Sequence, residues 1–310
     1  MKRNISFRLG LTSLAAICLL SSCDNSFLDK YPKGEINEAT AFSTYKTCCS
    51  YINQLYNVFY GNDFAQGGSI DSGLTHDDAH ASSARRDVYA GTIINWNTFK
   101  SKSSVYGTYA GQAKTIPTSS GWYSKPYEYI RKANIFLDHI EDPDVSDSER
   151  KHLEAVARFF RAYCHYALML NYGDCIYSDH TFGESSEELT GPRDSRLFVA
   201  DCIFKELLWC IENINDSIAE PNTVNSNVVK TFMTRFCLFE GTWRKYHGVV
   251  EEPEFVSGSA LLDKCIELGR ELAEANPVLY NGDGTAAFSG SGWGQLWTTE
   301  DLANVPGVFM

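Results

Sequence analysis

The sequence has few basic residues and none of the local motifs that mark the common enzyme classes. Its 310 residues include 27 Lys and Arg against 39 Asp and Glu, which gives a formal net charge of −12. Nucleic-acid phosphates require a basic protein surface, so this composition argues against nucleic acid as a partner. It also argues against docking on anionic lipid through basic patches. No nucleophile elbow, phosphate-binding loop or dinucleotide fingerprint is present, and we expect a protein that is not an enzyme.

Cysteine is not scarce, but no two cysteines have the C-x-x-C spacing of a zinc or redox site. Ten cysteines are present, of which Cys18 and Cys23 lie at the amino terminus. The others are Cys48, Cys49, Cys164, Cys175, Cys202, Cys210, Cys237 and Cys265. Several occupy apolar helical positions, where Cys behaves as a small hydrophobic residue. An exported protein can form disulfides, and the sequence leaves open whether these cysteines do so.

The densest group of possible metal ligands lies between His76 and His80. Two histidines four residues apart share a helix face, as metal sites require, but this segment has no helical pattern and we interpret it as a solvated loop. Paired acidic residues occur at 187–188 and 251–252, yet the two carboxylates of a glycosidase must face each other across a cleft. We therefore expect no metal, no cofactor and no catalytic residue.

The first 23 residues have the order of a lipoprotein export signal. Basic residues at positions 2, 3 and 8 precede an apolar run, and small residues at 21–22 precede Cys23. A bilayer span needs about 20 apolar residues, and this run is shorter. We expect a signal peptide over residues 1–22, an acyl lipid such as palmitate on the Cys23 thiol, and a tether that completes residues 23–39. The alternatives are a cleaved signal without lipid, or a membrane anchor.

Apolar residues at helical spacing dominate the rest of the chain. They predict helices over residues 40–60, 122–142, 146–173, 195–218, 228–246 and 258–275. A capping box at Ser146 and Glu149 predicts one helix start, and Gly173 predicts its end. Residues 63–121 are rich in Gly, Ser, Thr, Asn and Asp without a sustained period, which predicts a long irregular segment.

The predicted helices follow one another in pairs of about tetratricopeptide size, a repeat of about 34 residues. We expect a mainly α fold over residues 40–310, with a tetratricopeptide-like core of helical pairs and a long irregular, loop-rich segment. Arg158 and Arg161 flank aromatic core positions, where they can hold neighbouring helices or the following loop through charge-assisted hydrogen bonds. Asn134 is expected as a buried amide that bonds the backbone of a loop.

Several short stretches resemble one family in composition and in order. They are Phe27-Leu28-Asp29 after the cysteine, 130–137, 157–163 with 171–174, Pro192-Arg193, and 297–302. In this order the sequence resembles the SusD/RagB family of Bacteroidetes outer-membrane lipoproteins. Members of that family are usually much longer. The resemblance therefore implies that this sequence is an amino-terminal portion, with a helical domain that is incomplete at the carboxy terminus.

The residues of the irregular segment favour a sugar-binding site over other kinds of site. Trp96 and Asn97 lie there with Arg85, Arg86 and Tyr89. An indole face suits the apolar face of a sugar ring, and amide and guanidinium donors suit its hydroxyl edge. The resemblance points the same way, because ligands of that family lie on a surface rich in loop aromatics. The alternative is that Trp96 packs the loop onto the helices.

The resemblance also implies where the protein works and with what partner. It implies a lipid-anchored outer-membrane protein at the cell surface that captures an oligosaccharide or similar nutrient and passes it to a SusC-like TonB-dependent transporter. The residues alone leave two other functions possible. A glycan-degrading enzyme would have acidic residues that converge in an aromatic cleft. A ligand-free helical-repeat scaffold would bury Trp96 and bind protein on its concave helical surface.

Overall fold

The computed structural model describes residues 42–59, 86–87, 92–93, 121–278, 280 and 305–309. The chain divides into two units, Met1–Ala41 and Phe42–Met310, and every described residue belongs to the second unit. For residues 86–87, 92–93 and 121–122 the description covers the backbone alone. Within these ranges no helix has both the length and the apolar character that crossing a membrane requires.

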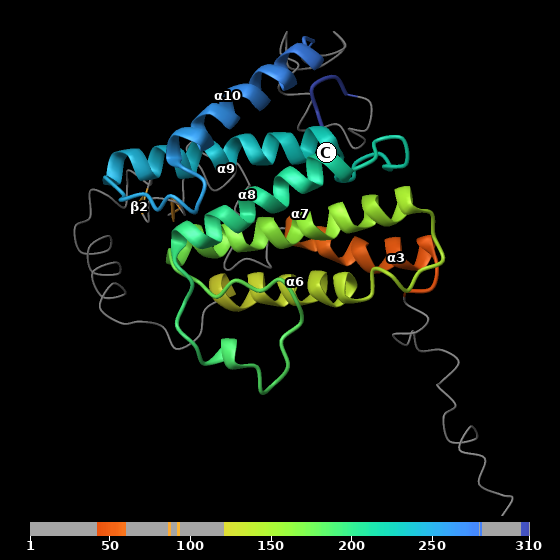
Figure 1. Ribbon diagram of the computed structural model, residues 1–310. Helices are drawn as coiled ribbons and strands as arrows, with labels where there is room; N and C mark the ends of the chain where they lie inside the picture. Colours follow the sequence, from red (N-terminus) through yellow and green to blue (C-terminus); the bar gives the residue numbers. More distant parts are fainter. Residues whose placement is uncertain are drawn as a thin grey trace, which may run out of the picture. The chain divides into compact units, whose positions relative to one another are not determined.

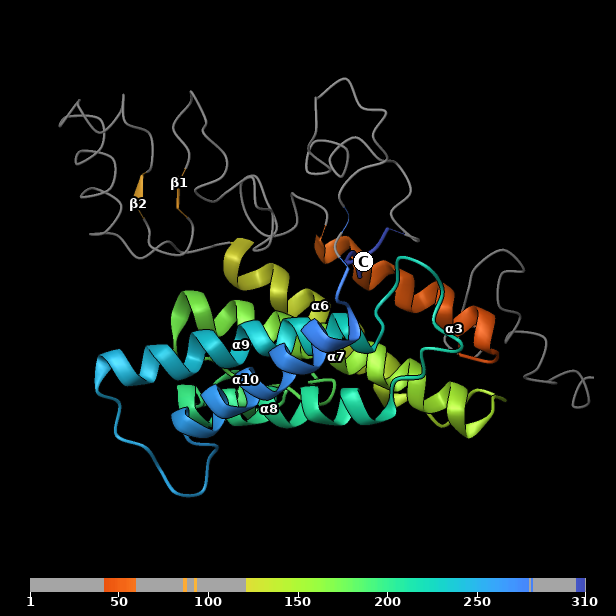
Figure 2. The ribbon, with the colours of Figure 1, turned by 90° about the horizontal axis from the view of Figure 1, so that it is seen from above.

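Helices make up nearly all of the regular structure in these ranges (Figure 1). The elements are α3 (Tyr45–Ile52), η2 (Asn53–Phe59), β1 (Arg86–Asp87), β2 (Thr92–Ile93), α6 (Gly121–Asp138), α7 (Asp147–Tyr172), η4 (Glu187–Leu189), α8 (Arg196–Asn213), α9 (Ser226–His247) and α10 (Gly258–Ala275). The long helices α6 to α10 pack on one another in chain order, and consecutive helices run in opposite directions (Figure 1, Figure 2). The predicted mainly α fold with a core of helical pairs is confirmed.

Most of the predicted irregular segment, residues 63–121, lies outside the described residues. Strands β1 and β2 belong to it and pair antiparallel, with Arg86 opposite Ile93 and Asp87 opposite Thr92. The segment ends where α6 begins. The possible metal ligands between His76 and His80 also lie outside the described residues.

Helix α7 is the central helix of the core. The Ser146 hydroxyl accepts a hydrogen bond from the Glu149 amide at 3.3 Å, and the Glu149 carboxylate accepts one from the Ser146 amide at 2.9 Å. This is the predicted capping box. The helix ends at Gly173 as predicted, with a φ of 71° that favours glycine. Between these ends almost every side chain from His152 to Met169 is buried, because α3, α6 and α8 all pack against this helix.

Three helices are shorter than the sequence predicts. The helix predicted over 122–142 ends as α6 at Asp138. The helix predicted over 40–60 starts later, because Thr44 caps α3, and the chain then continues as the 3-10 helix η2. The helix predicted over 195–218 ends as α8 at Asn213. Just beyond it, the Asn215 side chain accepts a hydrogen bond from the backbone amide two residues on at 2.9 Å. Local bonds of this kind by Asn compete with the helical hydrogen-bond pattern.

Aromatic side chains fill the space between α7 and α9. Phe159 meets Phe232 with ring centroids 5.5 Å apart, and Tyr166 meets Phe236 at 5.7 Å. Both pairs are edge-to-face, an arrangement worth about 0.5–1.5 kcal/mol beyond the buried area. Part of the high aromatic content of this chain therefore stabilises the helical core.

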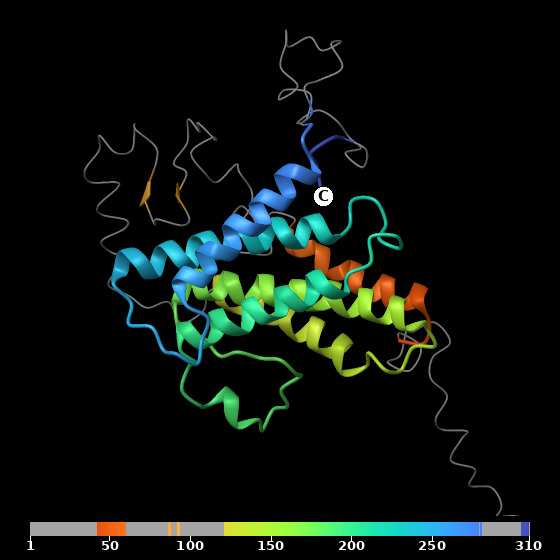
Figure 3. The same cartoon turned by 45° about the horizontal axis from the view of Figure 1, so that its top comes forward.

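Helices α9 and α10 approach each other at glycine, and α10 crosses α9 obliquely as it returns in the opposite direction (Figure 3). A Cβ atom on Gly241 would lie 2.8 Å from Leu262 Cγ and 3.0 Å from the carbonyl oxygen of Gly258. A Cβ atom on Gly269 would lie 3.9 Å from Thr234 Cγ2, which is ordinary contact. Gly241 is therefore the position at which the absent side chain permits the close packing.

We predict that Gly241→Ala lowers the free energy of unfolding by about 1–3 kcal/mol, because the added methyl group overlaps Leu262 and the α10 backbone. Gly269→Ala is the matched control. It adds the same group where there is room, and Ala is the better helix former, so its stability should be unchanged or up to about 1 kcal/mol higher. Urea denaturation followed by circular dichroism measures both variants. Equal stabilities for the two would contradict the close approach at Gly241.

Candidate functional site

A cleft of about 820 Å³ lies between α6 and the loop that follows α7. It is lined from α6 by Tyr123, Tyr127 and Arg131, and from the loop by His180 and Phe182. We name it the tyrosine cleft after its two α6 rings. Figure 1 shows the two elements, with α6 in yellow and the loop, which carries η4, in green.

Two tyrosines one helical turn apart form the α6 side of the tyrosine cleft. The ring centroids of Tyr123 and Tyr127 are 5.0 Å apart, and Tyr172 of α7 meets Tyr123 edge-on at 5.3 Å. The Tyr127 hydroxyl accepts a hydrogen bond from the Ile176 amide at 3.0 Å and donates one to the Ile176 carbonyl at 2.9 Å. Burial raises the pKa of Tyr127, so the hydroxyl stays protonated and both bonds hold this ring in one orientation.

Polar contacts hold the loop side of the tyrosine cleft to α6. Arg131 Nη1 donates to the Phe182 carbonyl at 2.8 Å, and the Thr181 amide donates to the Asp138 carboxylate at 3.2 Å. The rings of His180 and Phe182 meet edge-on, with centroids 5.0 Å apart. Phe182 is therefore positioned through its backbone carbonyl as well as through its ring.

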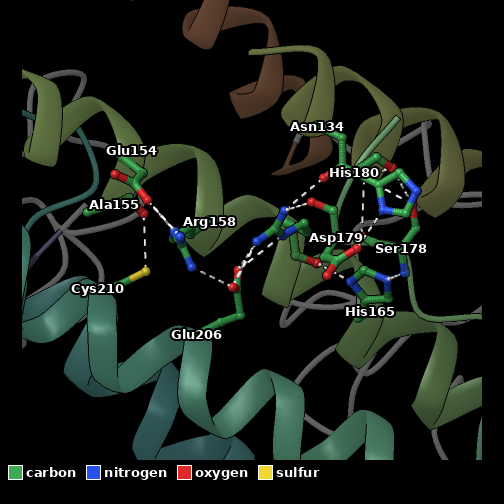
Figure 4. A network of polar contacts seen from close by, with 11 residues as sticks. Asn134, Glu154, Ala155, Arg158, His165, Ser178, Asp179, His180, Glu206 and Cys210 are labelled. Carbon is green, nitrogen blue, oxygen red and sulfur yellow. Dashed lines mark hydrogen bonds and ion pairs between the residues drawn. The ribbon is translucent and has the colours of Figure 1, made fainter. Parts of the chain in front are cut away.

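A buried amide fixes the backbone of the same loop (Figure 4). Asn134 is 0% exposed, and its Nδ2 donates to the carbonyls of Ser178 at 3.2 Å and of His180 at 2.8 Å. Its Oδ1 accepts from Arg161 Nη1 at 2.9 Å, and the same Nη1 donates to the Asp179 carbonyl at 2.6 Å. Both ends of the amide have partners, as a buried polar group requires. The sequence-based prediction for Asn134 is confirmed.

Arg161 connects this amide to α8 through a buried ion pair with Glu206. Its Nη2 lies 2.8 Å from both carboxylate oxygens of Glu206, and its Nε lies 3.1 Å from Oε2. Glu206 also accepts from Arg158 Nη1 at 2.9 Å. Burial disfavours the charged guanidinium, but the charge and hydrogen bonds of Glu206 outweigh it and raise the pKa of Arg161. The predicted role of the two arginines in holding a helix and a loop is confirmed.

A neutral histidine completes the network next to the loop. His165 Nε2 accepts from the Ser178 amide at 3.1 Å, so Nδ1 carries the proton and donates to the Arg161 carbonyl at 3.0 Å. Burial, with a smaller effect of the Arg161 charge, lowers the pKa of His165 to about 3. The Tyr177 ring lies 4.5 Å from the imidazole, centroid to centroid. His165 is uncharged at neutral pH and serves as a fixed hydrogen-bonding group.

The side chains of the tyrosine cleft suit the binding of a sugar better than its hydrolysis. Aromatic rings suit the apolar faces of sugars, and Ser124, Arg131 and His180 bring hydrogen-bonding groups. Among the described residues that line it, Glu184 is the one carboxylate, whereas glycoside hydrolysis uses a pair. The ranges that the structure describes contain no group of three His, Cys, Asp or Glu side chains suited to a metal ion.

The sugar site predicted from the sequence is not among the described side chains. The predicted site residues outside the described ranges are Arg85, Tyr89, Trp96, Asn97 and the lipidation residue Cys23. For Arg86 the structure describes the backbone, in β1. The sugar-binding role of the irregular segment and the lipid on Cys23 therefore stay predictions.

The sequence reasoning missed the residues of the tyrosine cleft. Tyr123 and Tyr127 have the i, i+4 spacing that brings two rings together on one helix face. This spacing is the sequence pattern from which the α6 side of the tyrosine cleft could have been predicted. No local sequence pattern predicts the residues on the loop side of the tyrosine cleft. Phe182 contacts Arg131 from 51 positions away in the sequence, so folding alone brings the two halves together.

A family model matches most of the chain. Residues 26–231 match a model of SusD-like proteins, described as "Starch-binding associating with outer membrane". No curated protein matches this sequence.

Solved structures share the fold at low sequence identity. A SusD-like protein from Bacteroides fragilis is 19% identical with a TM-score of 0.52, over 82% of this chain and 42% of its own. A SusD-like carbohydrate binding protein from Bacteroides vulgatus is 16% identical with a TM-score of 0.51, over 78% and 49%. A laminarin binding SusD-like protein is 14% identical with a TM-score of 0.52, over 77% and 45%. This chain thus spans less than half the length of these structures.

We predict that Glu206→Gln lowers the free energy of unfolding by about 3 kcal/mol or more, because it leaves the buried Arg161 guanidinium without its counter-charge. The matched control is Glu154→Gln. Glu154 pairs with Arg158 one turn away on α7. In the Glu154→Gln variant Arg158 still has its ion pair with Glu206, so the expected loss of stability is about 1 kcal/mol or less. Urea denaturation of both variants measures the difference. A loss for Glu206→Gln no larger than that for Glu154→Gln would contradict the central role of this pair.

Proposed function

This chain belongs to the SusD-like family, and we propose that it is a non-catalytic lipoprotein of the outer membrane that binds an oligosaccharide or similar nutrient. The family description names starch and the outer membrane, and one structural relative binds laminarin. Both ligands are polysaccharides. This agreement supports a glycan as the ligand class of this chain.

The tyrosine cleft is the observation that carries the proposal. It combines aromatic rings from α6 and the following loop with an arginine and a histidine. An aromatic contact or a net hydrogen bond is worth about 1 kcal/mol, so about four to eight of them beyond the cost of association give dissociation constants in the millimolar to micromolar range. Binding of this strength allows both capture and release, and no chemical step is needed.

The proposal assigns the amino terminus to membrane attachment. Residues 1–22 act as the signal peptide, Cys23 carries the lipid, and residues 23–39 tether the helical domain of residues 40–310. Each buried methylene of an acyl chain contributes about 0.8 kcal/mol, so two or more chains anchor a protein stably. At the cell surface the protein passes its ligand to a SusC-like TonB-dependent transporter. The order of the leader, the cysteine and the family match from residue 26 supports this arrangement.

We predict that the protein without residues 1–23 migrates more slowly in native gels that contain starch or laminarin, and that Phe182→Ala weakens this retardation about tenfold. The loss of one aromatic contact of about 1.4 kcal/mol corresponds to that factor. Tyr246→Ala is the control, because Tyr246 is 77% exposed on α9 and does not line the tyrosine cleft. It should leave retardation unchanged.

Two outcomes would contradict this assignment in different ways. If Phe182→Ala leaves retardation unchanged and Trp96→Ala abolishes it, the ligand binds at the residues predicted in the irregular segment and the tyrosine cleft is not the site. If the folded protein is retarded by no glycan on a broad panel, glycan binding itself is wrong and the ligand-free scaffold gains support. Release of sugar products from any glycan would favour the enzyme alternative.

We predict that radiolabelled palmitate is incorporated into the full chain in a bacterial host, and that Cys23→Ala abolishes this labelling because the thiol is the acyl acceptor. Cys18→Ala is the control, since it removes a thiol within the apolar run and keeps the run apolar. It should leave labelling intact. Gel fluorography measures the label. Label retained in Cys23→Ala would exclude Cys23 as the anchor.

A further inference from the structure

Helices α9 and α10, which pack on each other, carry one cysteine each. Cys237 is 0% exposed on α9, and Cys265 is partly exposed on α10. Both are free thiols in this structure. Because one thiol is buried and the other is partly accessible, their relative position decides whether they can react with each other.

The contacts on either side of the two cysteines set the register of the helix pair. Thr234 lies opposite Gly269, and Gly241 lies opposite Leu262. On α9, Cys237 lies between Thr234 and Gly241, and on α10, Cys265 lies between Leu262 and Gly269. In an antiparallel pair, residues between the same two contacts lie at the same height, so the two cysteines are level with each other.

The two cysteines also lie on facing sides of their helices. Cys237 precedes Gly241 by four residues, and Cys265 precedes Gly269 by four. Residues four apart share a helix face, and both glycines contact the opposite helix. Burial, and after it the charge of Cys265, raise the pKa of Cys237 to about 12, so Cys265 lies within electrostatic range of Cys237.

The close packing at Gly241 brings the two helices toward the separation that a disulfide requires. A disulfide needs Cα atoms about 4.4–6.8 Å apart. Axes about 8–10 Å apart place facing Cα atoms in or near this range, since each Cα lies about 2.3 Å from its axis. At Gly241 the packing is tight, because a Cβ atom there would lie 3.0 Å from a backbone oxygen of α10.

We propose that Cys237 and Cys265 form a disulfide that joins α9 to α10 when the chain meets an oxidising disulfide. The Cys265 thiolate, on the more accessible residue, attacks the oxidant and forms a mixed disulfide, releasing one thiol. The Cys237 sulfur then displaces the second thiol. Two protons and two electrons leave the protein, and the oxidant is reduced to two thiols. In the cell this step rests on the proposed export, because oxidising compartments lie outside the cytoplasm.

The bond would secure the last described long helix of the core. Among the described elements, α10 has α9 as its principal neighbour, so little else holds it in place. A cross-link between the two restricts the unfolded chain and so stabilises the folded one. No other pair of the eight described cysteines has this support, since the register contacts above frame this pair alone.

Oxidation of the purified full chain in detergent with oxidised glutathione tests the proposal. After alkylation and trypsin digestion without reductant, residues 236–244 and 265–270 should appear as one cross-linked peptide, because Arg235, Arg244, Lys264 and Arg270 are the flanking cleavage sites. Reductant should separate the two peptides. The melting temperature of the oxidised protein should exceed that of the reduced protein by about 5 °C or more.

The controls are single cysteine variants. Cys265→Ser should lose both the cross-linked peptide and the rise in melting temperature, whereas Cys202→Ser, on α8, should keep both. If the oxidised, folded protein yields Cys237 and Cys265 only as separately alkylated peptides, or links either one to another cysteine, the proposal is overturned. The oxidation takes place in solution and needs no lipid, transporter or glycan, so its result is independent of the proposed function.

Discussion

A buried ion pair between Arg161 of α7 and Glu206 of α8 holds the part of the described core that carries the tyrosine cleft. Taking two charges out of water is costly, and the attraction between them offsets this cost only when the geometry is good and every remaining donor has a partner. Here Glu206 accepts from Arg161 through two guanidinium nitrogens, and Arg161 also bonds Asn134 and a loop carbonyl. A single guanidinium therefore connects three helices and the loop after α7.

This constraint explains how an irregular loop can form one wall of a binding cleft. Asn134 and His165 bond the loop backbone from inside the core. On the outer side, Arg131 and Tyr127 bond the same loop from the surface of α6. The loop is held on two sides, so the aromatic lining of the tyrosine cleft is preorganised and a ligand would not have to order it.

Local sequence signals predicted the helices and several polar roles well. The capping box at Ser146 and the glycine at 173 mark the true ends of α7, because both depend on contacts within one turn. The buried role of Asn134 was also predictable, since an amide in an apolar helix face needs a nearby backbone partner. The partner of Arg161 was not, because Glu206 lies 45 positions away and no local pattern distinguishes it from other glutamates.

The sequence by itself determined the mainly α class, the helix order, the acidic charge and the resemblance to the SusD/RagB family. These depend on residue spacing and composition, which are local properties of the chain. The tertiary structure decided which residues share the tyrosine cleft and which faces of α9 and α10 meet. Both follow from the register and closeness of helix packing, set by long-range contacts at residues such as Arg131 and Gly241. Such contacts join positions far apart in the chain, where spacing carries no information.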